Sequence, residues 1–358
     1  MFIDGGSSVH CLLSQLLSKI CCPRPSENCG LFHMSNCISK AVWHYLPDLR
    51  GCYIQYQTVD LSALAASLQN CFKMTSKFLF EGIRMDSHFT PLENVCFARN
   101  EFLVKDDDVI LVSYPRSGTH WMIEILSLIY YNGDPSWVQT VPNYVRSPWI
   151  ESKDFQENKK KQDGSRLLTS HLPVQLFPKS YFTSNAKIIY IIRNPRDVVT
   201  SLYHLFKGGF RQKQPEEFDQ FLNDFMQGDF VYGSWFDHVL GWIKRREMGS
   251  FLLIFYEELQ KDFRGSVEKI CQFLGKKLKP HEIDSVLQNS SLSAMKENKM
   301  SNYSTPDNHI TRVFTEPMLR KGISGDWKNH FTVAQSEAFD KLFQEKMSGL
   351  DAALFPWS

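Results

Sequence analysis

The sequence predicts an α/β fold: a single domain with a mostly parallel central sheet, flanked by helices and carrying a phosphate-type binding loop. Strand-like and helix-like segments alternate from about residue 74 onward, as they do in doubly wound sheets. One segment is continuously apolar, which is typical of a strand covered on both faces. A chain of 358 residues, 43% of them hydrophobic, is long enough to bury a sizeable core.

The first predicted elements lie between residues 107 and 173. The run "DDVILVSYP" (107–115) predicts a buried strand that ends in a turn. The next segment, "THWMIEILSLIYY" (119–131), is apolar almost all round and predicts a buried helix. A short strand is expected in "RLLTSHLP" (166–173), again running into a turn.

The second half of the domain repeats this alternation. The segment "KIIYIIRNPRD" (187–197) predicts a central strand followed by a helix, with Asn194 as its cap, Pro195 at its first position and Asp197 near its positive end. A third core strand is expected in "FLLIFYEEL" (251–259). Further helices are predicted around 264–274, 280–289 and 333–348.

Residues 1–73 differ in character from the rest, and we expect an N-terminal extension of uncertain order followed by one domain over 74–358. Met74 is the expected natural start; a partner-binding or redox-sensitive arm is the alternative. Seven of the nine cysteines precede residue 74, which leaves Cys96 and Cys271 and excludes a disulfide scaffold. A reducing, cytoplasmic location is therefore expected.

Charge and hydropathy exclude two classes of partner. With 40 basic and 39 acidic residues the net charge is +1, which argues against a nucleic-acid or membrane-surface footprint over the whole protein. No run is long and apolar enough to span a bilayer. Any anion site must therefore be local.

One such site is predicted in "YPRSGTHW" (114–121). Gly118 and Thr119 open a helix whose backbone N–H groups point into the loop. Arg116 adds positive charge, and Ser117 and Thr119 add hydroxyl donors. The loop lacks the GxxxxGK[ST] pattern of nucleoside-triphosphate sites. An ordinary turn capped by Thr119 is the alternative.

Two further strand ends carry chemistry. In "IIRNPRDVVTS", Arg193 ends a strand and Ser201 lies along the next helix, which favours a second anion site over a structural pair between Arg193 and Asp197. In "TSHLP", His171 follows a strand and can act as a general base, although a lone histidine is more often structural. Two anion sites and a base on one rim indicate group transfer from a bis-anionic donor to a nucleophile that loses a proton.

From about residue 78 to its C-terminus the chain resembles the cytosolic sulfotransferases, most closely the hydroxysteroid (alcohol and bile-salt) subfamily. The stretches that carry the resemblance are "FLFEGI", "YPRSGTHW", "RSPWIE", "SHLPVQLFPKS", "RNPRDV", "YGSWFDHVLGW", "KICQFLGK", "MKENKMSNYS", "RKGISGDWKNHFTV" and "LFPW". This resemblance implies a 3′-phosphoadenylyl sulfate donor (PAPS), a small lipophilic alcohol such as a steroid or bile acid as acceptor, and no metal.

The resemblance also implies roles for individual residues. His171 matches the base, and Arg116 stands where the transition state is stabilised. Loop 114–121 matches the phosphosulfate cradle, and an acceptor wall is implied at Tyr144, Trp149, Tyr203, Phe206 and residues 301–316. The positions matched to donor binding are Arg116, Ser117, Gly118, Thr119, His120, Trp121, Arg193, Ser201, Tyr256, Leu292, Arg320, Lys321 and Gly322.

Three donor-site residues depart from the pattern of that family. Arg116 stands in place of the usual Lys, His120 in place of Thr or Asn, and Leu292 in place of an aromatic residue. A catalytically weak nucleotide- or steroid-binding homologue therefore stays open, as does a small-molecule kinase, although a kinase's magnesium-binding carboxylates are missing. The stretch "KNHFTVAQSE" resembles the family's dimerisation motif and implies a homodimer through Lys328, Thr332, Val333 and Glu337.

Overall fold

The computed structural model describes residues 77–152, 155, 165–207, 217–247, 250–304 and 317–357. The chain divides into two units, residues 1–75 and 76–358, and the described residues belong to the second. The prediction for residues 1–73 lies outside them. No helix of the described part is long and apolar enough to cross a membrane.

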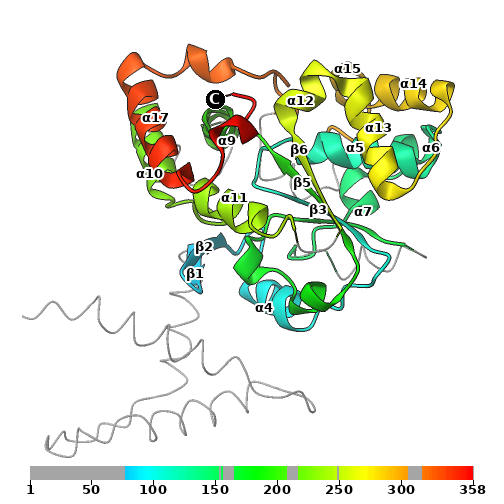
Figure 1. Cartoon of the computed structure of the whole chain (residues 1–358), viewed down its shortest axis with the longest axis horizontal. Helices are drawn as coiled ribbons and strands as arrows, with labels where there is room; N and C mark the ends of the chain where they lie inside the picture. Colours follow the sequence, from blue (N-terminus) through cyan, green and yellow to red (C-terminus); the bar gives the residue numbers. More distant parts are fainter. Residues whose placement is uncertain are drawn as a thin grey trace, which may run out of the picture. The chain divides into compact units, whose positions relative to one another are not determined.

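A four-stranded parallel sheet lies at the centre of the domain (Figure 1), with the strand order β4-β3-β5-β6. Its strands are β3 (Val109–Ser113), β4 (Leu167–Ser170), β5 (Lys187–Ile192) and β6 (Phe251–Phe255). A separate antiparallel hairpin consists of β1 (Lys77–Phe80) and β2 (Ile83–Asp86). Since β3 pairs in parallel with β4 and β5, and β5 pairs in parallel with β6, the carboxyl ends of all four strands lie at the same edge of the sheet.

Helices cover both faces of this sheet, and the side chains of the strands divide between two apolar clusters accordingly. In β3, Ile110 and Val112 belong to one cluster and Val109 and Leu111 to the other, as the period of two in a strand requires. The first face is covered by α4 (Leu92–Asn100), α9 (Pro195–Lys207), α10 (Phe218–Gln227), α11 (Trp235–Ile243) and α17 (Val333–Met347). The second is covered by α5 (Thr119–Tyr130), α6 (Ser136–Thr140), α12 (Tyr256–Lys261), α13 (Phe263–Leu274) and α14 (Pro280–Asn289).

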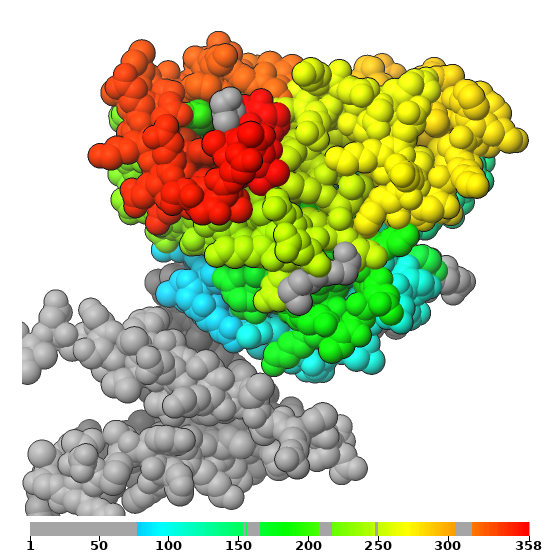
Figure 2. All heavy atoms as spheres, viewed as in Figure 1, coloured from blue at the N-terminus to red at the C-terminus, as the bar shows by residue number. Residues whose placement is uncertain are grey.

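Shorter elements complete the domain. They are α7 (Asn143–Arg146), α15 (Leu292–Glu297), and the 3-10 helices η3 (Val174–Leu176), η4 (Lys179–Thr183), η5 (Asp326–Asn329) and η6 (Ala352–Leu354). In Figure 2 the C-terminal residues, drawn in red, lie beside the yellow-green segment that includes β6. Phe355 packs at the chain end against Phe255 at the end of β6, with ring centroids 6.1 Å apart.

The predicted fold class is confirmed, and so is the predicted alternation of strands and helices along the chain. The third core strand is shorter than predicted, because helix α12 begins at Tyr256, directly after Phe255. Asn194 caps α9 as predicted, since its Oδ1 accepts from the backbone N–H of Arg196 at 3.0 Å. Thr119 is not the cap of α5; Gly118 takes that position in a left-handed conformation.

Candidate active site

The carboxyl ends of the four parallel strands open into one cavity of about 310 Å³, a volume at the lower end of small-ligand sites, about 300–1,000 Å³. Each strand contributes a residue just past its end: Arg116 after β3, His171 after β4, Arg193 after β5 and Tyr256 after β6. The structure brings together all of the predicted catalytic and donor-binding residues at this cavity except Ser117, which is fully buried and does not line it.

The loop between β3 and α5 is a tight turn with an unusual third residue. The N–H of Ser117 donates to the carbonyl of Tyr114 at 3.2 Å, and Arg116 has a φ of 70°. Pro at the second position with positive φ at the third is the pattern of a type II turn, in which Gly normally fills the third position. A left-handed arginine is strained by about 1–2 kcal/mol, so the surrounding contacts must hold it there.

Those contacts fix the whole guanidinium of Arg116. Its Nε donates to Ser201 Oγ at 3.0 Å, its Nη2 to the carbonyl of Met318 at 3.0 Å, and its Nη1 to Met318 Sδ at 2.8 Å. Burial, and then repulsion by Arg193 and Arg320, lowers the pKa of Arg116 to about 10, so it stays charged at neutral pH. The side chain therefore joins the loop to the segment that precedes Arg320.

Gly118 and Tyr256 lie in close contact at the start of α5. A Cβ at Gly118, where φ is +102°, would come within 2.7 Å of the Tyr256 ring. No side chain caps the N-terminus of α5 within the described part of the chain, because the Thr119 hydroxyl is paired with Ser113 Oγ at 2.7 Å. Close approach of backbone and open helix N–H groups suit an anionic ligand.

Arg193 packs over that tyrosine ring. Its guanidinium carbon is 4.4 Å from the centroid of Tyr256, and its two terminal nitrogens donate to the carbonyls of Arg116 and Ile323. Its buried Nε has no partner in the described residues. Asp197, the alternative partner considered from the sequence, instead accepts from the backbone N–H groups of Gly325 and Trp327.

The segment 318–326 adds further positive charge. Arg320 and Lys321 both donate to the carboxylate of Asp326, at 2.7 and 2.6 Å. Leu292, the first residue of α15, packs against Gly322, where a Cβ would lie 2.6 Å from a Leu292 methyl group. Leu292 thus fills with an aliphatic side chain the place for which the related family has an aromatic ring.

Trp121 and Tyr256 form the aromatic part of the predicted donor site. Their ring centroids are 5.5 Å apart at an angle of 72°, and Trp121 also packs on Phe263 at 5.1 Å. The indole Nε1 of Trp121 and the Oγ of Ser117 are both buried without a partner in the described residues. Together with Arg193 Nε, they are unsatisfied polar atoms at positions predicted to hold an anionic nucleotide, so the residues present fit such a group.

His171 has a tautomer that the structure determines. Its Nδ1 lies 2.7 Å from the backbone carbonyl of Ser113, which can only accept, so Nδ1 carries the proton and Nε2 is left with the lone pair. Burial, with the charge of Arg116, lowers the pKa of His171 to about 4. The imidazole is therefore neutral at pH 7 and can accept a proton.

Glu151 supports His171 and was not predicted. Its Oε1 accepts from the backbone N–H of His171 at 2.7 Å, while its buried Oε2 has no partner in the described residues. Burial raises the pKa of Glu151 to about 7, although the hydrogen bond from the His171 N–H acts to lower it. His238 holds the same residue from the other side, with Nε2 3.2 Å from the carbonyl oxygen of His171.

His120 lies among the residues predicted for the acceptor wall. Its Nδ1 is 2.9 Å from the hydroxyl of Tyr303 and 3.3 Å from Asn143 Oδ1, and its ring packs on Trp149 at 5.5 Å. Burial, and then the charge of Arg116, lowers the pKa of His120 to about 3, so it is neutral. Its contacts are thus with Tyr303, Asn143 and Trp149 rather than with Arg193 or Tyr256.

The acceptor-wall prediction is met in part. Tyr144, Trp149 and Phe206 line the cavity, and Trp149 is placed beside β4 by a parallel bridge to Thr169. Tyr203 does not line it and packs on Phe218 and Phe221, because it lies on the side of α9 that faces α10. Residues 305–316 lie outside the described residues.

Several residues that shape the site were missed by sequence reasoning, namely Ser113, Glu151, Met318 and Asp326. Glu151 and Asp326 lie within the quoted stretches "RSPWIE" and "RKGISGDWKNHFTV". The resemblance therefore covered both residues but implied no role for either. Met318 had no signal, since its contact with Arg116 joins residues 202 positions apart.

Comparisons with known proteins agree with this architecture. Residues 106–351 match the family described as "Sulfotransferase domain". The chain is 56% identical over 280 residues to the 3-beta-hydroxysteroid sulfotransferase of Cavia porcellus, covering 78% of this chain and 96% of that protein. It is 54% identical over 288 residues to Sulfotransferase 2A1 of Macaca fascicularis, covering 79% and 100%.

Solved structures share the fold. The mouse sulfotransferase SULT7A1 complexed with PAP matches with a TM-score of 0.64 and 35% identity, over 77% of this chain and 96% of that one. Retinol dehydratase, solved with androsterone and the inactive cofactor PAP, matches with a TM-score of 0.68 and 22% identity, over 79% and 91%.

Proposed function

The chain belongs to the sulfotransferase family, and on that premise we propose that it transfers a sulfuryl group from PAPS to the hydroxyl of a small lipophilic alcohol. The acceptor class is a steroid or bile acid, or a related alcohol. The observation that carries this proposal is one cavity in which a neutral His171, with its Nε2 lone pair free to accept, lies together with Arg116 and Arg193.

The donor supplies, when bound, an activated sulfuryl group on a phosphate leaving group. On this proposal Trp121 and Tyr256 hold the adenine, and Arg193, Ser201, Arg320, Lys321 and Gly322 hold the 3′-phosphate. The open N-terminus of α5, with Ser117, Gly118 and Thr119, holds the 5′-phosphate. Leu292 contributes an apolar contact in place of a stacked ring.

His171 takes the proton from the acceptor hydroxyl at its Nε2, since Nδ1 is already bonded to the Ser113 carbonyl. Glu151 and His238 fix the backbone of His171 on both sides and so hold its ring in position. Arg116 stabilises the negative charge that develops on the bridging oxygen as the bond to sulfur breaks. In-line transfer requires the base and the cation to be held in fixed positions, and the packing around these buried side chains holds them there.

The acceptor wall is assigned to Tyr144, Trp149 and Phe206, to which we add His120. His120 was first matched to donor binding, but its contacts with Tyr303, Asn143 and Trp149 support a role on the acceptor side. Aromatic faces suit a flat ring system.

A homodimer through Lys328, Thr332, Val333 and Glu337 is part of the proposal. All four side chains are exposed, and Val333 exposes 76% of its surface, so all four are accessible to a second copy of the chain. We also propose a cytoplasmic location, which the free thiols of Cys96 and Cys271 support.

The deciding experiment is a turnover assay with PAPS and a panel of steroid and bile-acid alcohols, run without metal and then with magnesium. Metal-independent sulfation of at least one alcohol is expected. Tight binding of the bisphosphate product without turnover would favour a catalytically weak binding homologue instead. Magnesium-dependent phosphoryl transfer from a nucleoside triphosphate would favour a kinase.

A further inference from the structure

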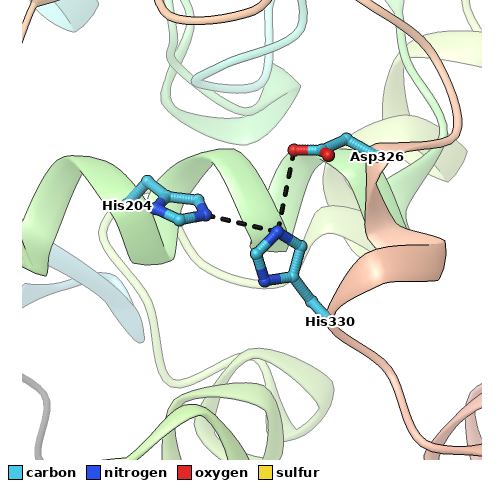
Figure 3. A group of neighbouring side chains, drawn as sticks. All are labelled: His204, Asp326 and His330. Carbon is cyan, nitrogen blue, oxygen red and sulfur yellow. Dashed lines mark hydrogen bonds and ion pairs between the residues drawn. The ribbon is translucent and has the colours of Figure 1, made fainter.

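Three potential metal ligands meet outside the cavity, where α9 passes the 3-10 helix η5 (Figure 3). His204 lies in the last turn of α9, Asp326 begins η5, and His330 directly follows it. Asp326 and His330 are four residues apart, a spacing that brings their side chains to the same side of a helical turn. None of the three lines the described cavity.

The distances between their ligand atoms fit one bound cation. The Nε2 atoms of His204 and His330 are 3.4 Å apart, and His330 Nε2 is 3.7 Å from Asp326 Oδ2. The chosen ligand atoms all lie within 4.8 Å of one another. Zinc bonds to N and O of about 2.0–2.2 Å at tetrahedral angles place neighbouring ligands about 3.3–3.6 Å apart, so small shifts would complete the geometry.

Hydrogen bonding alone explains the histidine pair poorly. At 3.4 Å the two imidazole nitrogens are farther apart than the usual 2.7–3.2 Å of an N–H donor and its acceptor. A metal binds the neutral form of imidazole through its lone pair. The two Nε2 atoms are the ring nitrogens that lie next to each other, so both lone pairs could reach one ion.

The carboxylate already has cationic partners. Although burial acts to raise the pKa of Asp326, hydrogen bonds from Lys321 and Arg320 hold it well below its usual range. Oδ1 accepts from Lys321 and Asn329, while Oδ2 accepts among the described residues from Arg320 alone, which leaves one lone pair of Oδ2 unused within that part of the chain. Those two positive charges oppose a cation, so its affinity must come from the two imidazoles.

We propose that His204, Asp326 and His330 form a binding site for one Zn²⁺ ion, with a fourth position open to water. Two imidazole nitrogens and one carboxylate oxygen are a donor set that selects zinc over magnesium or calcium, which prefer oxygen ligands. Its three ligands do not line the described cavity, although Asp326 also binds Arg320 and Lys321, which do. The proposed metal site does not depend on the proposed function.

The test is a titration of the full chain, freed of metal by a chelator and kept reduced, with Zn²⁺ and with Co²⁺ as a spectroscopic probe. Because the chain has nine cysteines and eleven histidines, other sites will bind metal, and the comparison must be between variants. The informative variants are His204→Ala and His330→Ala. The matched control is His281→Ala, an exposed histidine on α14.

The expected result is that the parent and His281→Ala bind equal amounts of metal, whereas His204→Ala and His330→Ala each bind one equivalent less. The Co²⁺ absorption lost in His204→Ala should lie in the visible region and contain no thiolate charge-transfer band. Equal binding by the parent and His204→Ala would overturn the proposal, as would a lost signal with thiolate character. If His330→Ala does not fold, His204→Gln replaces it, with the same loss expected.

Discussion

The guanidinium of Arg116 donates to two atoms of Met318, its backbone carbonyl at 3.0 Å and its thioether sulfur at 2.8 Å, while its Nε donates to Ser201. Three of the five N–H groups of this guanidinium are therefore directed at protein atoms, one from each nitrogen. A planar group that is held at all three nitrogens cannot easily turn to direct one N–H at a single oxygen. This arrangement bears directly on the charge that must be stabilised during transfer.

Replacing Arg116 by Lys should raise the rate of the chemical step. An ammonium group cannot reproduce the three contacts, so it is free to direct one donor at the leaving oxygen, and a better-aimed cation lowers the barrier. Single-turnover kinetics should show a faster step with equal or slightly weaker donor affinity. A slower Arg116→Lys variant would mean that Arg116 is already well placed.

The His171→Ala variant should lose about 10²–10⁴-fold in turnover, the range for a positioned general base. Binding of adenosine 3′,5′-bisphosphate should persist, because the imidazole contacts the Ser113 carbonyl rather than the basic residues. Calorimetry and steady-state kinetics measure the two quantities separately. His281→Ala serves as the control, and near-parental turnover in His171→Ala would contradict the assignment.

The pH at which His171 titrates should rise when the donor site is filled. In the free enzyme, burial and the charge of Arg116 lower the pKa of His171 to about 4. Phosphates bound nearby would favour the imidazolium form and raise this pKa. Histidine NMR titrations with and without the bisphosphate check this. An unchanged or lower pKa in the complex would place the anion away from His171.

The stability of this protein should begin to fall at a pH well above the range in which ordinary carboxylates titrate. Burial lowers the pKa of His171 to about 4 and those of His120 and His238 to about 3, against 6.5 for an unfolded histidine. Below pH 6.5 the unfolded chain therefore binds protons that the folded chain does not, so stability falls with pH down to about 4. Denaturant midpoints measured between pH 7.5 and 4.5 should decrease steadily. A flat profile would argue against three neutral buried imidazoles.

Arg193→Ala should weaken binding of the bisphosphate by about 10–100-fold, since one charge-assisted hydrogen bond contributes about 1.5–3 kcal/mol. It also leaves the carbonyls of Arg116 and Ile323 without their donor. Arg193→Lys, which keeps the charge and loses the fork, should lie between the parent and Ala. Calorimetric titration decides the order, and equal affinities for all three would remove Arg193 from the site.

Much of this site could be predicted because parallel strands end at one edge. Arg116, His171 and Arg193 each follow an apolar run in the sequence, and parallel pairing alone brings such positions together. The family resemblance then supplied their roles. Elements with strong apolar patterns, such as β5 and α5, were likewise predicted within a few residues.

What escaped prediction depends on contacts between distant segments. The partners of Arg116 and of His171 are set by packing, so neither Met318 nor the Ser113 carbonyl has a local signature. Tyr203 was misplaced because neighbouring positions of an amphipathic helix face different partners, and a one-residue shift exchanges a cavity for a helix interface. The contacts of His120 with Tyr303 and Asn143 likewise have no local signature in the sequence.

The contact between Arg116 and Met318 also exposes the site to oxidants. A thioether is a weak acceptor, and its oxidation to the sulfoxide creates a strongly polar S=O group on a residue that is half-buried at the edge of the cavity. The guanidinium would then be held more tightly against Met318, and reduction of the sulfoxide would release it. Oxidation of this one methionine would therefore act directly on an arginine of the site, and no cysteine is among the described residues that line the cavity.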